Sequence, residues 1–298
     1  TPYSMKSLIR TFFLFTLLFF IANKSQATHI VGGDVSYENV GQDSFLVRVV
    51  LFRDCSGIAG PATVSVNLSS TCGGAFTTTL VNTTSTEISQ LCPTQIPNST
   101  CNGGAWLGLM EYVYEGVVYV GPSCNSWTIS WSSCCRVANL LNSGALGTYL
   151  YAKLYSGSFG DNSSPRFGSA GSPTVFTNQV AHYNFGATDT DGDSLAYFMS
   201  PGYSDATTLI PYATNYSYQQ PFSTSITTTL DASTGQLSFT PTMIGIYSLN
   251  VRVEEYDRLT GVLKGNTHRD TSVRGTSSSN QPPRWSSNGM VNLGGGTV

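Results

Sequence analysis

The residues best suited to chemistry lie in residues 186–197, where Asp189, Asp191 and Asp193 alternate around a glycine turn. Carboxylates this close repel one another, and a bound calcium ion would relieve the repulsion because it takes six to eight oxygen ligands. A solvated turn is the simpler alternative, but it needs only one or two Asp or Asn residues. The spacing is not that of an EF-hand, since glycine is fourth instead of sixth and Ser200 stands where glutamate is required. We therefore predict a calcium site here.

The composition limits the possible partners of the chain. Its 298 residues have room for about two domains. Charged residues make up 10%, the net charge is −3, and the 14 Lys and Arg residues are thinly spread. Nucleic-acid binding through a basic patch is excluded, because it needs clustered cations. Low charge with 16 Tyr and many Gly, Ser and Thr favours an extracellular all-β protein over a cytosolic enzyme.

The N-terminal region predicts export. Lys6 and Arg10 precede an apolar run at residues 12–22, and small residues around Ala27 follow. This pattern is typical of a secretory signal peptide, so we assign residues 1–27 to upstream residues and a signal, with a mature start at Thr28. The run is short for a membrane span, which needs about 20 apolar residues, and we expect no span in the mature part. Residues 281–298 are predicted to be a linker and the start of a further domain.

The seven cysteines all precede residue 136, which predicts disulfides confined to the first domain of an exported protein. Zinc is the competing interpretation, but no Cys-x-x-Cys pair or nearby His supports it. Adjacent cysteines point to opposite sides of an extended chain, so we expect each of the last two to pair elsewhere. At least six of the seven should be oxidised. They are Cys55, Cys72, Cys92, Cys101, Cys124, Cys134 and Cys135.

Residues 28–158 read as the strands of a disulfide-containing β-sandwich. Residues 44–53 are apolar on both faces apart from Arg48, as expected of a central strand. In residues 127–131 the apolar side chains alternate with hydroxyls, which places Trp127 and Trp131 on one face. That face could stack against a sugar. Because several cysteines lie close by in the sequence, we instead expect the two tryptophans to lie in the core of the sandwich. Residues 91–105 read as a disulfide-stapled loop. Further strands are predicted at residues 62–69, 75–81, 111–120 and 147–155.

Residues 161–280 are predicted to form a second β-sandwich after a boundary at residues 157–167. Tyr247, Leu249, Val251 and Val253 alternate with polar residues, so one face of that strand should be buried and the other wet. About seven short strands in such a length are typical of an immunoglobulin-like domain. The predicted fold class is therefore all-β, with two tandem β-sandwich domains. The strands are placed at residues 175–178, 182–186, 195–199, 226–230, 236–239, 246–253 and 261–273.

A serine protease is the enzyme that the sequence superficially suggests. The run Ile-Val-Gly-Gly at residues 30–33 and Gly-Asp-Ser at residues 192–194 are similar to segments of chymotrypsin-like proteases. A serine nucleophile needs a histidine base within reach. The chain has only His29, His182 and His268, none of them where that family keeps its base. We predict no enzyme activity.

The second domain resembles the cadherin-like repeats of bacterial surface proteins. The matching residues are 189–197, the Asp-x-x-Thr-Gly-x-Leu-x-Phe-x-Pro pattern at 231–241, and Gly-x-Tyr at 245–247. Residues 161–167 are similar to the cadherin inter-domain segment, with one extra residue. The resemblance implies calcium shared between linker and repeat, with Asp161, Asn162, Asp189 and Asp191 as ligands. The glutamate motifs that complete cadherin sites are not visible in the sequence.

The whole mature chain also resembles large surface or secreted repeat proteins of gliding Bacteroidetes, which implies an adhesin exported by the type nine secretion route. A cysteine pair of such relatives would fall near Thr177 and Gly275, where this chain has none. The matching segments are residues 28–33, 52–55, 111–114, 127–131, 162–167, the Asp-rich turn, 254–256 and 269–270.

These observations predict a non-enzymatic extracellular or cell-surface structural or adhesion protein stiffened by calcium. Its partner would be a surface glycan or protein, or neighbouring repeats of its own kind. The alternative is a carbohydrate-binding module that uses Trp and Tyr side chains of the first domain, which burial of Trp127 and Trp131 would count against. Two roles for calcium stay open: fixing the angle between the domains, or stabilising the second domain alone.

Overall fold

The computed structural model describes residues 29–121, 124, 126–144, 146–155, 162–222 and 226–278, and the backbone alone of residues 284–286 and 289–291. The predicted signal peptide at residues 1–27, the start at Thr28 and the linker residue Asp161 lie outside these ranges. Most of the predicted tail, residues 281–298, also lies outside them.

Long strands make up the first half of the chain. In one of them, Val64, Val66 and Leu68 are buried while the residues between them are exposed, which is the period of two that a strand requires. Two short 3-10 helices, η1 (Pro93–Asn98) and η2 (Thr100–Asn102), occupy the predicted loop at residues 91–105. The strands are β1 (Ile30–Gly41), β2 (Ser44–Asp54), β3 (Thr63–Ser70), β4 (Ala75–Glu87), β5 (Leu109–Tyr119), β6 (Trp127–Ser133) and β7 (Thr148–Leu154).

The second half contains shorter strands and one long hairpin. No helix in the described residues is long and apolar enough to cross a membrane. The all-β prediction is confirmed. The strands are β8 (Arg166–Phe167), β9 (Thr174–Phe176), β10 (Ala181–Asn184), β11 (Ala187–Thr188), β12 (Ser194–Met199), β13 (Thr229–Leu230), β14 (Gln236–Phe239), β15 (Gly245–Tyr256), β16 (Leu263–Thr276), β17 (Arg284–Ser286) and β18 (Gly289–Val291).

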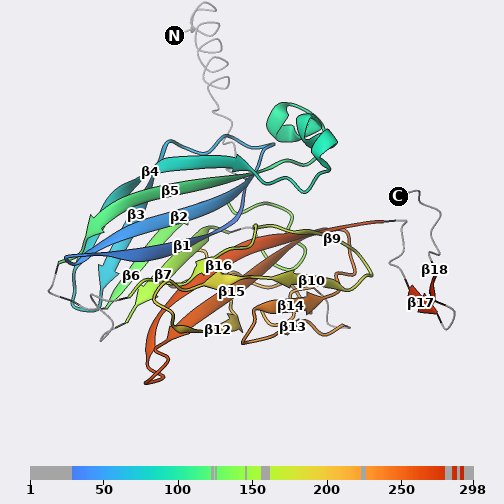
Figure 1. The fold of residues 1–298 in the computed structure, drawn as a ribbon. Coiled ribbons are helices and arrows are strands. Elements are labelled where there is room, and N and C mark those ends of the chain that lie inside the picture. Colours follow the sequence, from blue (N-terminus) through green and yellow to red (C-terminus); the bar gives the residue numbers. More distant parts are fainter. Residues whose placement is uncertain are drawn as a thin grey trace, which may run out of the picture.

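Strand β16 joins the two halves (Figure 1). One of its edges pairs with β15 along nearly its whole length. Its other edge pairs with β7 at residues 265–267 and with β1 at residues 269–270. The hydrogen-bonded order β1-β2-β5-β4-β3-β6-β7-β16 therefore returns to β1 and closes into a ring. The sequence did not predict this shared sheet, and the domain boundaries stay a prediction.

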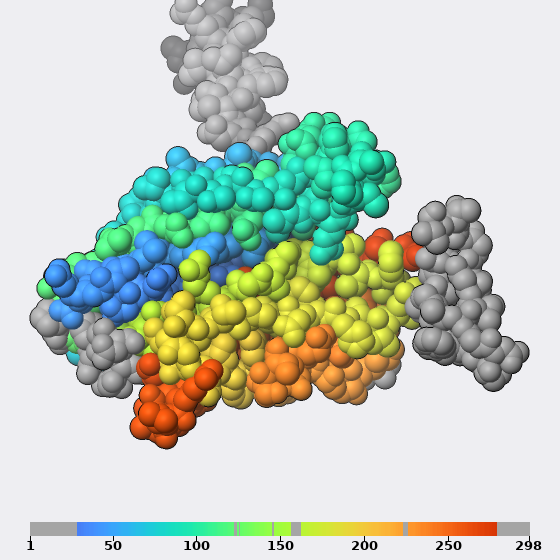
Figure 2. Space-filling view, in the orientation of Figure 1, coloured from blue at the N-terminus to red at the C-terminus, as the bar shows by residue number. Residues whose placement is uncertain are grey.

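Each half has its own apolar core. The first lies inside the ring of β1 to β7 and includes Tyr37, Trp127 and Leu150. The second lies between β14 and the β15–β16 hairpin, where the rings of Phe239 and Tyr247 both pack against Phe222. In the space-filling view, the η1–η2 loop stands out from the strands, as does the turn between β15 and β16 (Figure 2).

The face of β15 that the sequence predicts to be exposed to solvent is only partly exposed. Ser248 and Asn250 are 1% and 2% exposed. The segment that follows β6 crosses this face, and Asn142 forms 2.8 Å hydrogen bonds with both the N–H and the C=O of Ser248. The prediction was wrong at these two positions because alternation along a strand cannot reveal a distant segment that packs on its outer face.

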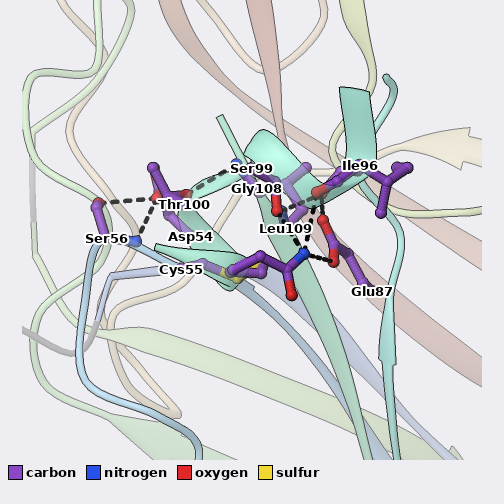
Figure 3. The surroundings of a disulfide bond; sticks show 12 residues. Asp54, Cys55, Ser56, Glu87, Ile96, Ser99, Thr100, Gly108 and Leu109 are labelled. Atoms are coloured by element: carbon purple, nitrogen blue, oxygen red, sulfur yellow. Dashed lines mark hydrogen bonds between the residues drawn. A yellow bond between two sulfur atoms is a disulfide. The ribbon is translucent and has the colours of Figure 1, made fainter. Parts of the chain in front are cut away.

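Four of the seven cysteines form disulfides. Cys55 bonds to Cys101 and Cys72 to Cys124, while Cys92, Cys134 and Cys135 are in no disulfide. The first bond ties the η1–η2 loop to the end of β2 (Figure 3).

The expectation that Cys134 and Cys135 face opposite sides was wrong, because their Sγ atoms lie 2.7 Å apart. The chain is not extended there: β6 has ended, and Cys135 has a φ of +73°.

Candidate metal centre

The Asp-rich turn follows β11 and leads into β12. The N–H of Asp193 donates a 2.7 Å hydrogen bond to Oδ1 of Asp189, which closes the turn. Gly192 has a φ of +84°, a conformation that glycine adopts without strain. Asp193 is buried, Asp189 is half-buried and Asp191 is exposed. The turn therefore directs two of its three predicted carboxylates inward.

Glu255 completes the cluster. It lies near the end of β15, and its side chain is fully buried. Its carboxylate and those of Asp189 and Asp193 each place an oxygen within 4.8 Å of the others. The sequence reasoning missed this residue. The signal was present in the alternation of β15, because Glu255 continues the inward face that carries Val251 and Val253.

The linker reaches the same point. Asn162 is fully buried, and its Nδ2 donates hydrogen bonds of 2.5 Å to Oε1 of Glu255 and 3.3 Å to the hydroxyl of Tyr37 on β1. The N–H of Ser163 donates a 2.5 Å hydrogen bond to Oδ2 of Asp191. Of the predicted ligands, Asn162, Asp189 and Asp193 come together, Asp191 holds the linker, and Asp161 lies outside the described residues.

Three buried oxygen atoms in this cluster have no hydrogen-bond partner among the described residues. They are Oδ1 of Asn162, Oδ2 of Asp189 and Oε2 of Glu255. A buried polar atom left unpaired costs about 1–3 kcal/mol, and more when it is charged. A proton held between Glu255 and Asp189, or a cation between the three atoms, would satisfy them.

The electrostatics of the cluster are unbalanced. Burial above all raises the pKa of Glu255 to about 9, against a hydrogen bond from Asn162 that lowers it. The charge of Asp189, its contact with the Glu255 carboxyl group and the charge of Asp193 also raise this pKa. The only ammonium that pairs with the cluster in the described residues is Lys264, whose Nζ lies 2.6 Å from Oδ2 of Asp193. Burial opposes the charged form of Lys264, but this hydrogen bond and the nearby carboxylates raise its pKa overall. One lysine faces several carboxylates.

The donor set indicates which kind of cation fits. The clustered ligand atoms are carboxylate and amide oxygens, with no Cys or His among them. Hard cations such as calcium and magnesium prefer oxygen, whereas zinc sites use nitrogen and sulfur. Calcium tolerates irregular ligand arrangements and magnesium requires a near-ideal octahedron. The residues present therefore fit calcium.

The predicted tryptophan platform is not a surface. Trp127 and Trp131 are 5% and 7% exposed and pack in the core of the first half. Nε1 of Trp127 donates a 2.7 Å hydrogen bond to the C=O of Cys124, which satisfies its polar atom inside the core. Their burial excludes these side chains as a sugar-binding face.

Comparisons of the chain with family models, with curated proteins and with solved structures found no match.

Proposed function

We propose that this chain is an extracellular or cell-surface structural or adhesion protein, without enzymatic activity, whose two halves are tied together by a calcium ion. Asn162, Asp189, Asp193 and Glu255 would hold the ion. The observation that carries the proposal is the fully buried carboxylate of Glu255, which has an unpaired oxygen and two further carboxylates beside it. We also propose that the chain is related to the large surface or secreted repeat proteins that it resembles in sequence.

The position of the cluster supports a tying role. The linker that supplies Asn162 is bound to β1 of the first half, because the N–H of Tyr37 donates to Oγ of Ser164 and the N–H of Ser164 donates to the C=O of Tyr37, both at 2.8 Å. The other proposed ligands belong to the second half. An ion at the cluster would add ligand bonds between a segment fixed to β1 and the end of β15.

Export is supported by the signal-like N-terminus and by the two disulfides, which persist in oxidising compartments. The low charge and the tyrosine-rich composition are compatible with an exposed surface protein.

Thermal unfolding of the secreted chain tests the calcium part. Ligand that binds only the folded state stabilises it by about 2.7 kcal/mol at a hundredfold excess over Kd. We expect calcium to raise Tm and a chelator to reverse the rise, with magnesium at the same concentration less effective. An equal Tm in calcium and in chelator would refute it.

Protease treatment of intact cells tests the location. A surface protein should be cleaved while a cytosolic marker survives. Protection of the chain in intact cells, with cleavage only after lysis, would overturn the proposed location.

A further inference from the structure

A cavity of about 230 Å³ opens on the outer face of β3, β6 and β7, and none of the residues that line it belongs to the metal cluster. We call it the tyrosine cavity. Its lining residues combine aromatic rings, hydroxyls and one cation, and they are Ser69, Thr128, Tyr149, Tyr151, Lys153, Tyr203 and Ala206.

Strand register explains why these side chains meet. Because Trp127 and Ile129 face the core, Thr128 between them faces outward. Thr128 pairs with Lys153 of β7 on one side and with Ser69 of β3 on the other. The three side chains therefore form a polar row across neighbouring strands.

The aromatic part of the cavity combines both halves of the chain. Tyr149 and Tyr151 stand on β7, and Tyr203 comes from the segment after β12, where its C=O accepts a 3.1 Å hydrogen bond from the N–H of Tyr149. The ring of Tyr203 lies 6.5 Å from that of Tyr149 and 5.9 Å from that of Tyr151. His268 stacks on Tyr151 at 4.9 Å and fixes it from behind. The rings form an aromatic wall of the cavity.

Lys153 is the only charged residue among the described residues that line the cavity. Its Nζ lies 5.3 Å from the centre of the Tyr151 ring, and it forms no salt bridge with another described residue. An ammonium with no carboxylate partner beside hydroxyls is suited to an anionic ligand.

We propose that the tyrosine cavity binds one uronic-acid ring of an acidic polysaccharide. A sugar ring has an apolar C–H face that can pack on the tyrosines, hydroxyls that can exchange hydrogen bonds with Ser69 and Thr128, and a carboxylate that can pair with Lys153. The volume is smaller than the roughly 300–1,000 Å³ of sites for drug-sized ligands, which fits a single ring. The argument for this site does not depend on whether the chain binds calcium.

Calorimetric titration of the full secreted chain with oligogalacturonate, oligoglucuronate and oligomannuronate, at fixed calcium concentration, tests the proposal. We expect at least one of them to bind, and its carboxyl-reduced derivative to bind about tenfold more weakly. Lys153→Gln and Tyr149→Ala should each weaken binding about tenfold or more. The matched controls Arg258→Gln and Tyr119→Ala, which change exposed residues elsewhere, should not alter binding.

The proposal is overturned if none of the three uronates binds, or if Tyr149→Ala binds like the unsubstituted chain while its melting curve shows that it is folded. Equal binding of the carboxyl-reduced oligomer overturns the role of Lys153. Binding of polyglutamate as tightly as the uronate would assign the cavity to acidic peptides and overturn the sugar assignment.

Discussion

Glu255 is a carboxylate at a position where the alternation of its strand places apolar side chains. Because burial and the neighbouring carboxylates raise the pKa of Glu255 to about 9, its side chain is protonated at neutral pH without a cation. The charged form is stable there only when a cation and hydrogen-bond donors satisfy its oxygens. Asn162 satisfies one oxygen of Glu255, and the other has no partner in the described residues. The sequence predicted the turn that supplies Asp189 and Asp193. It did not predict Glu255 as a ligand: the alternation of β15 places this glutamate on the inward face, but nothing near it in the sequence shows that it meets Asp189 and Asp193.

His268 leads to a prediction about pH. It is fully buried, and burial above all lowers its pKa to about 3, with the charges of Arg136 and Arg252 acting in the same direction. Tyr151 and Tyr203 cover its ring, and its Nε2 donates to the C=O of a proline. The unfolded chain therefore takes up this proton first as the pH falls. The stability that the neutral, buried His268 contributes is fully present above pH 6.5, and it is lost as the pH falls toward 3.

We expect the free energy of unfolding to fall by about 2–3 kcal/mol between pH 6.5 and 4.5 through this group alone. Urea unfolding of the chain and of His268→Gln across that range isolates it, because all other groups are common to both. Parallel pH profiles of the two proteins would contradict the prediction.

The adjacent thiols of Cys134 and Cys135 lead to a prediction about oxidation. Their Sγ atoms are 2.7 Å apart and Cys134 is exposed. In an oxidising exterior we expect them to form a disulfide with each other, giving two electrons and two protons to the thiol oxidant of that compartment. Together with the two existing bonds, this makes six oxidised cysteines and leaves Cys92 reduced. Alkylation under denaturing, non-reducing conditions followed by mass spectrometry should label one cysteine; labelling of three would show that the pair stays reduced.

At the level of elements, β16 is held to β1 by a buried ion pair. Nε and Nη2 of Arg269 donate to Oδ2 of Asp34 at 2.9 and 2.6 Å, and these two residues are direct partners in the register of β1 and β16. The guanidinium also lies 4.3 Å from the centre of the Phe167 ring. The pair therefore links the first strand of the chain to the last long one.

Arg269→Met should destabilise the protein by about 3–5 kcal/mol, because it leaves Asp34 buried without its partner. The double variant with Asp34→Asn should recover most of the loss. Arg258→Met, on an exposed turn, serves as the control and should change stability by no more than about 0.5 kcal/mol. Urea unfolding measures all three, and a double variant no more stable than the single one would contradict this account of the pair.

The sequence predicted individual strands but not how distant strands pair. Alternation at residues 127–131 predicted β6 and its inward tryptophans, because the pleat alone determines which side chains share a face. The pairing of β16 with β1 and β7 was not predicted. Asp34 and Arg269 are far apart in the sequence, and a local pattern carries no information about which distant strand edge will be its partner.

At the scale of the whole molecule, the shared sheet bears on the proposed role of calcium. Because β16 pairs with β1 and β7, the relative position of the halves is fixed by strand pairing as well as by the linker. We therefore expect calcium to stabilise the fold without setting an interdomain angle. Small-angle scattering below the melting temperature should give the same maximum dimension in calcium and in chelator, while Tm falls in chelator. A larger and broader dimension in chelator would show that the halves are hinged.

Calorimetric titration of calcium into Glu255→Gln, beside Glu254→Gln, tests the central claim most directly. Glu254 is the adjacent glutamate, but its carboxylate is paired with Arg252 at 2.8 Å and accepts the hydroxyl of Tyr256 at 2.5 Å, so it is a matched control outside the cluster. The unsubstituted chain and Glu254→Gln should bind calcium with a Kd on the order of 10⁻⁴ to 10⁻³ M. Glu255→Gln should remain folded, release no heat of binding, and melt at the same temperature in calcium and in chelator. Calcium binding by Glu255→Gln equal to that of the unsubstituted chain, or no binding by any of the three proteins, would contradict the account.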